Sequence, residues 1–224
     1  MPNTRYLITN REVYNERINE KDGVIAPADP NAPRETLRVD GREEARERLR
    51  FGFIPGDQPL PVTKNDPNAP GDPNDLITLY PHAFDDDPVV TAPGDAAAHA
   101  GSGALFTDLY RDMCGADGGD ALVFVHGYNL DLADALRLMG ELESKYLVEG
   151  SPVRHLVVFT WPARSSLIKY RDDVRDSLVS GRALGRAILK LGTFFRHFFA
   201  PAPAGSAEAV QPRNPLCGRK IHLL

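Results

Sequence analysis

Two short loops of the chain combine residue types that suit catalysis on a parallel sheet. A His-Gly step, in His126-Gly127-Tyr128-Asn129, comes directly after the apolar run 121–125. Gly127 lets the backbone turn sharply there and aim its N–H groups at a ligand. In serine hydrolases built on parallel sheets, one oxyanion-hole N–H comes from such a loop, and its counterpart here is the backbone N–H of Tyr128. The competing interpretation is that His-Gly only marks a strand-to-helix turn.

The second loop begins with Trp161-Pro162, after the apolar run 156–159 and Thr160. Trp161 is the single tryptophan of the chain. At the carboxyl end of a strand it either forms the wall of an acyl pocket, together with Pro162, or serves packing alone. Both interpretations stay open at this point.

No complete catalytic set accompanies these loops. A hydrolase nucleophile of this class sits in a Gly-x-Ser-x-Gly turn, and none of the eight serines has that context. Ser180, before Gly181, is the nearest match, but it falls inside a helical pattern. His126 belongs to the oxyanion loop, and His222 would precede the nucleophile instead of following it. The sequence therefore assigns no catalytic residue, no metal ligand and no cofactor.

The second half of the chain alternates between strand and helix patterns, which predicts an α/β fold with parallel strands and flanking helices. Asp131 is a plausible N-cap for the helix between the first two strands. In the last helix, the stripe that holds Gly181, Gly185 and Gly192 is expected to face the sheet closely. The predicted strands lie at 121–125, 156–159 and 220–224, and the predicted helices at 131–146 and 170–195.

The first half lacks this regular alternation of strand and helix patterns, and we therefore divide the chain into 1–120 and 121–224. Residues 1–120 are rich in Pro and Gly turns, with candidate strands at 6–9, 51–54 and 76–80 and an exposed helix at 41–50. This region is expected to wrap a core that the second part builds.

The motif order of the second half resembles a bacterial family of α/β-hydrolases of unassigned substrate. The resemblance is carried by three segments: Val123-Phe124-Val125-His126-Gly127-Tyr128-Asn129, Asp134-Ala135-Leu136 and Val158-Phe159-Thr160-Trp161-Pro162-Ala163-Arg164-Ser165-Ser166. A fourth segment, Tyr6-Leu7-Ile8-Thr9-Asn10-Arg11, is similar to the way family members begin. The resemblance implies a serine esterase-like or lipase-like site. In the family the strand matching 221–224 leads into the nucleophile elbow, so the sequence is expected to hold only the amino-terminal portion of the hydrolase core.

Composition excludes several classes of protein. The net charge of −5 gives no general attraction to nucleic acid. No apolar run reaches the roughly 18 residues of a membrane span, and no signal peptide is evident, so we expect a cytoplasmic protein. Cys114 and Cys217 make no disulfide framework and are expected to be inert.

The favoured function is therefore hydrolysis of a small ester-like substrate once the active site is complete, with no turnover by this chain alone. The alternative is a non-catalytic binding or interaction module on a hydrolase-like half-sheet. The apolar strand at 220–224 lacks guarding residues, which predicts self-association or a partner that completes the sheet. A nucleotide-binding domain is set aside because no Gly-x-Gly-x-x-Gly loop follows a strand.

Overall fold

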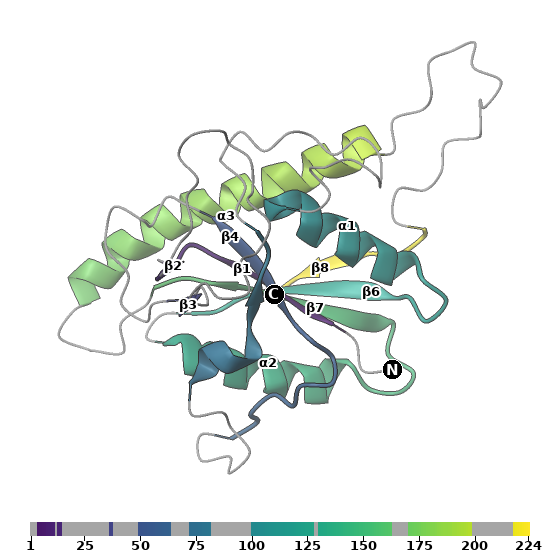
Figure 1. Ribbon diagram of the computed structural model, residues 1–224, viewed down its shortest axis with the longest axis horizontal. Coiled ribbons are helices and arrows are strands. Elements are labelled where there is room, and N and C mark those ends of the chain that lie inside the picture. The colour runs from purple at the N-terminus through teal and green to yellow at the C-terminus, as the bar shows by residue number, and fades with distance from the viewer. Residues whose placement is uncertain are drawn as a thin grey trace, which may run out of the picture.

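A six-stranded mixed sheet forms the centre of the computed structural model (Figure 1). Its strand order is β5-β4-β1-β7-β6-β8. The structure describes residues 4–11, 13–14, 36–37, 49–63, 72–81, 100–127, 130–162, 170–198 and 217–224. The expected helix at 41–50 falls mostly outside these residues.

Four neighbouring strands of the sheet are parallel; at one edge β4 pairs antiparallel with β1, and β5 in turn pairs antiparallel with β4. The parallel strands are β1 (Arg5–Thr9), β6 (Asp120–Val125), β7 (Val153–Thr160) and β8 (Ile221–Leu223); the two at that edge are β4 (Arg50–Ile54) and β5 (Thr78–Leu79). A separate pair joins β2 (Val13–Tyr14) to β3 (Thr36–Leu37). All the strands expected from the sequence are present, and the predicted α/β fold is confirmed.

Helices cover both faces of the sheet. α1 (Gly101–Cys114) and α3 (Tyr170–Phe198) lie on one face, and α2 (Leu132–Tyr146) lies on the other (Figure 1). A short 3-10 helix, η2 (Pro73–Leu76), precedes β5. None of the described helices is long and apolar enough to cross a membrane.

α2 forms where the sequence predicts it. The Asp131 carboxylate accepts the backbone N–H of Asp134, which satisfies one of the N–H groups that a helix start leaves without a partner. Leu132, Leu136 and Met139 then recur at helical spacing, and all three are buried against the sheet.

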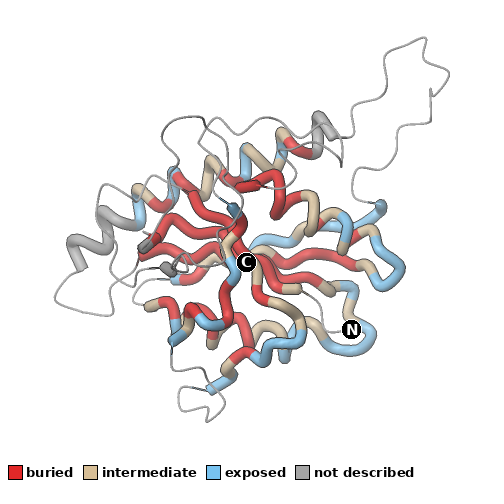
Figure 2. The backbone as a smooth tube through the Cα atoms, in the orientation of Figure 1, coloured by how far each residue is buried: buried red, intermediate tan, exposed pale blue. Residues whose placement is uncertain are grey.

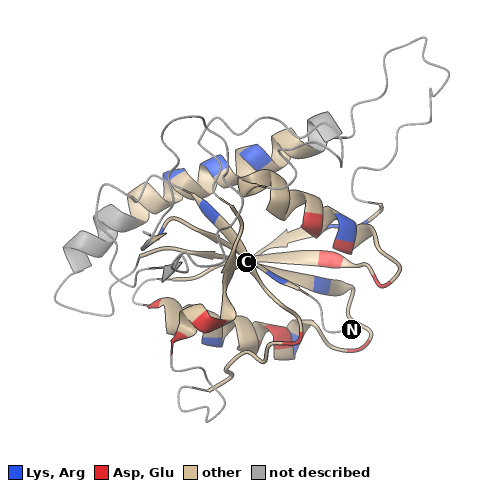
Figure 3. Ribbon diagram, in the orientation of Figure 1, with Lys and Arg blue, Asp and Glu red and all other residues tan. Residues whose placement is uncertain are grey.

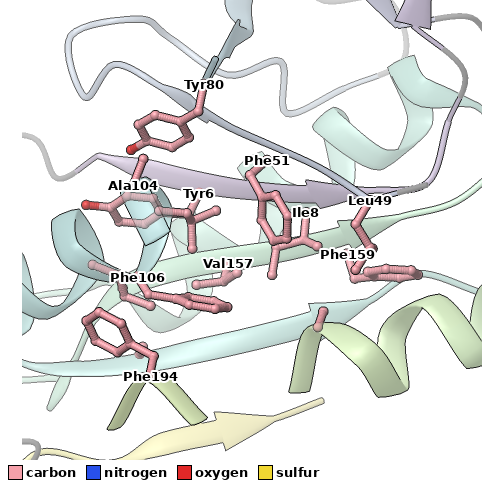
Figure 4. Packing of buried hydrophobic residues seen from close by; sticks show 14 of the residues in the cluster. Tyr6, Ile8, Leu49, Phe51, Tyr80, Ala104, Phe106, Val157, Phe159 and Phe194 are labelled. Carbon is pink, nitrogen blue, oxygen red and sulfur yellow. The ribbon is translucent and has the colours of Figure 1, made fainter. Parts of the chain in front are cut away.

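Alternate residues of the central strands face two separate cores, as the period of a strand requires. On one face, Tyr6 and Val157 pack under α1 and α3; on the other, Leu7 and Val158 pack against α2. Figure 2 shows the buried residues gathered along these strands and on the helix faces turned toward them. In the first core, the rings of Phe106 and Phe194 lie 5.8 Å apart and join α1 to α3 (Figure 4).

The first half of the chain contributes the middle of the sheet, which corrects the expectation that it wraps a core built elsewhere. β1 lies between β4 and β7, pairing antiparallel with the first and parallel with the second. The buried Arg5 guanidinium lies 2.8 Å from the Glu143 carboxylate of α2 and donates to the backbone oxygens of Pro55 and Gln58. Strands from both parts thus share one sheet, and the division at residue 120 stays a prediction.

The orientation predicted for α3 is wrong. Ser180, Ala183 and Ala187 face the protein interior, whereas Gly181 and Gly185 lie on the outer side. A Cβ atom at either glycine would meet no atom within 4 Å, so neither glycine serves a close approach to the sheet. Small alanine and serine side chains provide that approach instead.

The two cysteines are paired, which corrects the expectation that both are inert. A disulfide joins Cys114, at the end of α1, to Cys217, just before β8, with Cα atoms 5.7 Å apart. Cysteines 103 positions apart carry no local signal of pairing. Disulfides persist in oxidising compartments and are reduced in the cytosol, so this bond argues against the expected cytoplasmic location, which stays a prediction.

Replacing both cysteines by serine should lower the free energy of unfolding by about 4–5 kcal/mol, because the bond closes a loop of roughly 100 residues in the unfolded chain. Urea unfolding of the wild type and the double variant measures the difference. Reductant should destabilise the wild type and leave the double variant unchanged. Equal stability of all three samples would show that the bond does not form in solution.

Candidate functional site

Three neighbouring strands end together at one edge of the sheet and bring the predicted loops side by side. Thr9 of β1 pairs with Thr160 of β7, and Val125 of β6 pairs with Phe159 of β7. The segments that follow are Asn10-Arg11, His126-Gly127 and Trp161-Pro162. In open parallel sheets ligands bind at this carboxyl edge, so it is the candidate site.

The His126 ring connects the ends of β6 and β7. Its Nε2 accepts the backbone N–H of Trp161 at 3.0 Å, and the hydroxyl oxygen of Thr160 lies 3.0 Å from the same nitrogen. Nε2 therefore carries no proton, and Nδ1–H donates to the backbone oxygen of Gly127 at 2.8 Å. Both ring nitrogens are engaged, so the ring holds the two loops in a fixed relation.

Trp161 makes two further contacts with His126. Its indole N–H donates to the backbone oxygen of His126 at 3.0 Å, and the two rings stack with centroids 5.5 Å apart and planes 4° from parallel. Trp161 and Pro162 are both buried. Trp161 thus packs against His126, and the role of the two residues as a pocket wall stays a prediction.

Burial lowers the pKa of His126 to about 4, because the charged imidazolium would lose its hydration; the nearby Arg11 charge acts in the same direction. A histidine that stays neutral at physiological pH and uses both ring nitrogens internally does not exchange protons with a substrate. His126 is thus a positioning residue, consistent with its assignment to a loop and not to a triad.

Two polar residues at this edge, Asn10 and Arg11, were given no role in the site by the sequence interpretation. The buried Arg11 guanidinium donates from Nε to Thr160 Oγ1 at 3.1 Å, and burial lowers its pKa to about 10, which leaves it charged. The Asn10 amide donates to Ser180 Oγ of α3 at 3.0 Å. The position of Asn10 and Arg11 in the sequence could have indicated this placement, because polar residues directly after a buried strand lie at the carboxyl edge of the sheet. Ser180 is buried in this contact, within a helix as expected.

Gly127 is exposed, and its role in the loop stays a prediction. The described residues with φ in the left-handed region do not include it, so the loop does not need the conformational freedom of glycine there. A Cβ atom at this position would meet no atom within 4 Å. The missing side chain therefore leaves open space directly beside His126.

The remaining predicted loop residues, Tyr128 and Asn129, lie outside the described residues, and their roles stay predictions. Within the described parts of the chain, no group of three or more His, Cys, Asp or Glu side chains is arranged to hold a metal ion.

Residues 102–194 match the model of a protein family described as alpha/beta hydrolase of unknown function (DUF900). The match spans α1 through most of α3 and includes both loops of the candidate site. Comparison with curated proteins and with solved structures gives no significant match. The resemblance predicted from the HGYN and TWPARSS motifs is confirmed over this part of the chain.

The His126 pKa predicts acid destabilisation. The unfolded histidine takes up a proton near pH 6.5, and the folded one resists it down to about pH 4. The free energy of unfolding should therefore fall as the pH drops from 6.5 to 4, with a full contribution from His126 of about 3 kcal/mol. Burial also lowers the pKa of His155, which acts in the same direction.

Urea unfolding at pH 7, 5.5 and 4.5 measures this slope, which should be shallower in His126→Gln. An NMR titration of the wild type should place the midpoint of the His126 ring near pH 4. A midpoint above pH 6 would show that the ring is open to solvent.

Proposed function

We propose that this chain, whose residues 102–194 match an α/β-hydrolase family, forms one wall of a serine-hydrolase site for a small ester-like substrate. The carrying observation is the open space over Gly127, beside a His126 ring fixed by both of its nitrogens. A substrate carbonyl that enters this space lies next to the backbone of the 126–129 loop. His126, the first residue of this loop, is fixed by hydrogen bonds and ring stacking with Trp161, so little reorganisation of His126 accompanies binding.

In the proposed chemistry the backbone N–H of Tyr128 donates to the oxyanion that forms when a serine attacks the ester carbonyl. Such a donor stabilises the transition state by about 2.7–4 kcal/mol. A histidine other than His126 takes the serine proton and returns it to the leaving alcohol. Trp161 and Pro162 border the acyl group.

The sequence supplies the oxyanion loop without an identifiable nucleophile, since none of its serines stands in a Gly-x-Ser-x-Gly turn. We therefore propose that these 224 residues alone bind the substrate class but do not turn it over. The alternative, a binding module without catalysis, is favoured by one observation: the single described histidine of the site is neutral and fully engaged.

Substrate binding is testable because Trp161, the single tryptophan, lies at the site. Ethyl butyrate should change its fluorescence saturably in the wild type. Gly127→Val should abolish this response while leaving the thermal unfolding midpoint unchanged, since the new side chain points into open space. Gly181→Val, which also enters open space but on α3, is the matched control and should keep the response.

A fluorophosphonate probe tests the absence of turnover separately. The expected result is no serine labelling above that of denatured protein, and no hydrolysis of p-nitrophenyl butyrate. Labelling of a serine would mean that a nucleophile is present and that the inactivity proposal is wrong. If Gly127→Val kept the fluorescence response to ethyl butyrate, the substrate would not bind at this loop, and the proposed binding site would be wrong.

A further inference from the structure

The hydrogen bonds of Arg11, Thr160 and His126 form one directional chain. Arg11 Nε–H can only donate, and it donates to the Thr160 hydroxyl oxygen at 3.1 Å. His126 Nε2 lies 3.0 Å from the same hydroxyl and, since it accepts the backbone N–H of Trp161, carries no proton of its own. The Thr160 O–H therefore donates to Nε2, and the chain of hydrogen bonds runs from Arg11 through Thr160 to His126.

The chain of hydrogen bonds ends at the backbone oxygen of Gly127, which can only accept. The His126 Nδ1–H donates to this oxygen at 2.8 Å. With a donor at the Arg11 end and an acceptor at the Gly127 end, each hydrogen between them has a single direction. Successive hydrogen bonds of this kind polarise and strengthen one another away from water. A change at Arg11 should therefore affect the Gly127 carbonyl.

The end of β1 places Arg11 at the start of these hydrogen bonds. Thr9, the last residue of β1, pairs with Thr160 of β7, and its hydroxyl oxygen accepts the backbone N–H of Arg11 at 3.0 Å. Figure 3 shows charged residues on α1, α2 and α3, whereas Arg11 lies at the edge of the sheet and is only 1% exposed. A buried charge is costly unless it is hydrogen-bonded, and Arg11 meets this requirement through Thr160 and the backbone oxygen of Leu130, 3.4 Å away.

The peptide unit after Gly127 is the group that these hydrogen bonds can orient. A peptide unit is planar and trans, so its N–H points opposite to its C=O. His126 holds the C=O of this unit, and its N–H is the group to which the proposed function assigns the substrate oxyanion. We propose that Arg11 is a positioning residue of the ester site, which acts through Thr160 and His126 to turn this N–H away from the ring and toward the substrate. This role rests on the proposed function, to which it adds a residue from the first half of the chain.

Burial separates this role from a direct contact with the substrate, because the Arg11 guanidinium has almost no surface left for a ligand. Its charge has a second effect on the same hydrogen bonds. Burial is the largest cause of the lowered pKa of His126, and the Arg11 charge acts in the same direction. A ring that stays neutral keeps Nε2 as an acceptor, so the charge of Arg11 preserves the direction in which the hydrogen bonds run.

Solvent exchange of the His126 Nδ1–H proton, followed by NMR on the full chain at pH 7, tests these hydrogen bonds directly. Thr160→Val removes the hydroxyl and should speed the exchange about fivefold or more, the factor expected for one net hydrogen bond. Arg11→Met should do the same, and should also raise the pKa of His126 from about 4 because the charge is lost. Thr160→Ser keeps the hydroxyl and should exchange like the wild type.

Thr107→Val is the matched control for this experiment. It makes the same change on α1, at a buried hydroxyl oxygen that has no hydrogen-bond partner among the described residues. Exchange of the His126 proton should therefore stay at the wild-type rate. Unchanged exchange in Thr160→Val, or equal acceleration in Thr107→Val, overturns the proposed coupling between Arg11 and the Gly127 carbonyl.

Ethyl butyrate binding, read from Trp161 fluorescence, tests the positioning role. Thr160→Val and Arg11→Met should weaken binding about 2- to 10-fold, the range of one net hydrogen bond. Thr160→Ser and Thr107→Val should bind like the wild type. Faster proton exchange with unchanged binding overturns the role of Arg11 and leaves the proposed function intact. A wild type that does not bind ethyl butyrate overturns the proposed function and this role together, while the exchange rates still decide whether the hydrogen bonds are coupled.

Discussion

The parallel pairing of β1 with β7 is the constraint on which the remaining structure depends. It joins the start of the chain to a strand in its second half through five consecutive residue pairs, from Arg5 with Leu156 to Thr9 with Thr160. The same pairing divides the interior into two cores, because successive side chains of both strands point to opposite faces. It also sets the level at which both strands end, and so decides which polar residues meet at the candidate site.

At that edge the structure uses polar side chains mainly to fix one another. The Thr160 hydroxyl lies between the Arg11 guanidinium and the His126 ring, and the His126 ring lies against Trp161. Each buried polar atom named here has a partner, which removes the cost of burying it unsatisfied. The outcome is a set of mutually fixed side chains next to the exposed Gly127. Such an arrangement suits a site in which backbone groups, and not mobile side chains, recognise the ligand.

The local patterns predicted most elements and the parallel pairing of β6, β7 and β8, but not the central place of β1 or the orientation of α3. α2 was predictable because the Asp131 cap and the apolar period coincide. α1 was missed because its N-cap, Ala100, has no capping side chain and its first turn is rich in glycine. α3 forms where the sequence predicts a helix, but the pattern selected the stripe of Gly181 and Gly185 for the interior, where the short side chain of Ala183 lies. The central place of β1 depends on its pairing with residues about 150 positions away, and nothing in the sequence of β1 itself indicates that pairing.

That separation has a consequence for how the protein is made. β7 leaves the ribosome about 150 residues after β1. At roughly 5–20 residues per second, β1 waits on the order of 10–30 seconds for its parallel neighbour. During this time the described strand that can pair with it is β4, an antiparallel partner about 45 residues away. Among the described strands, the antiparallel pair of β1 and β4 can therefore form before β7 is made, and the parallel pairing is added to the other edge of β1 afterwards.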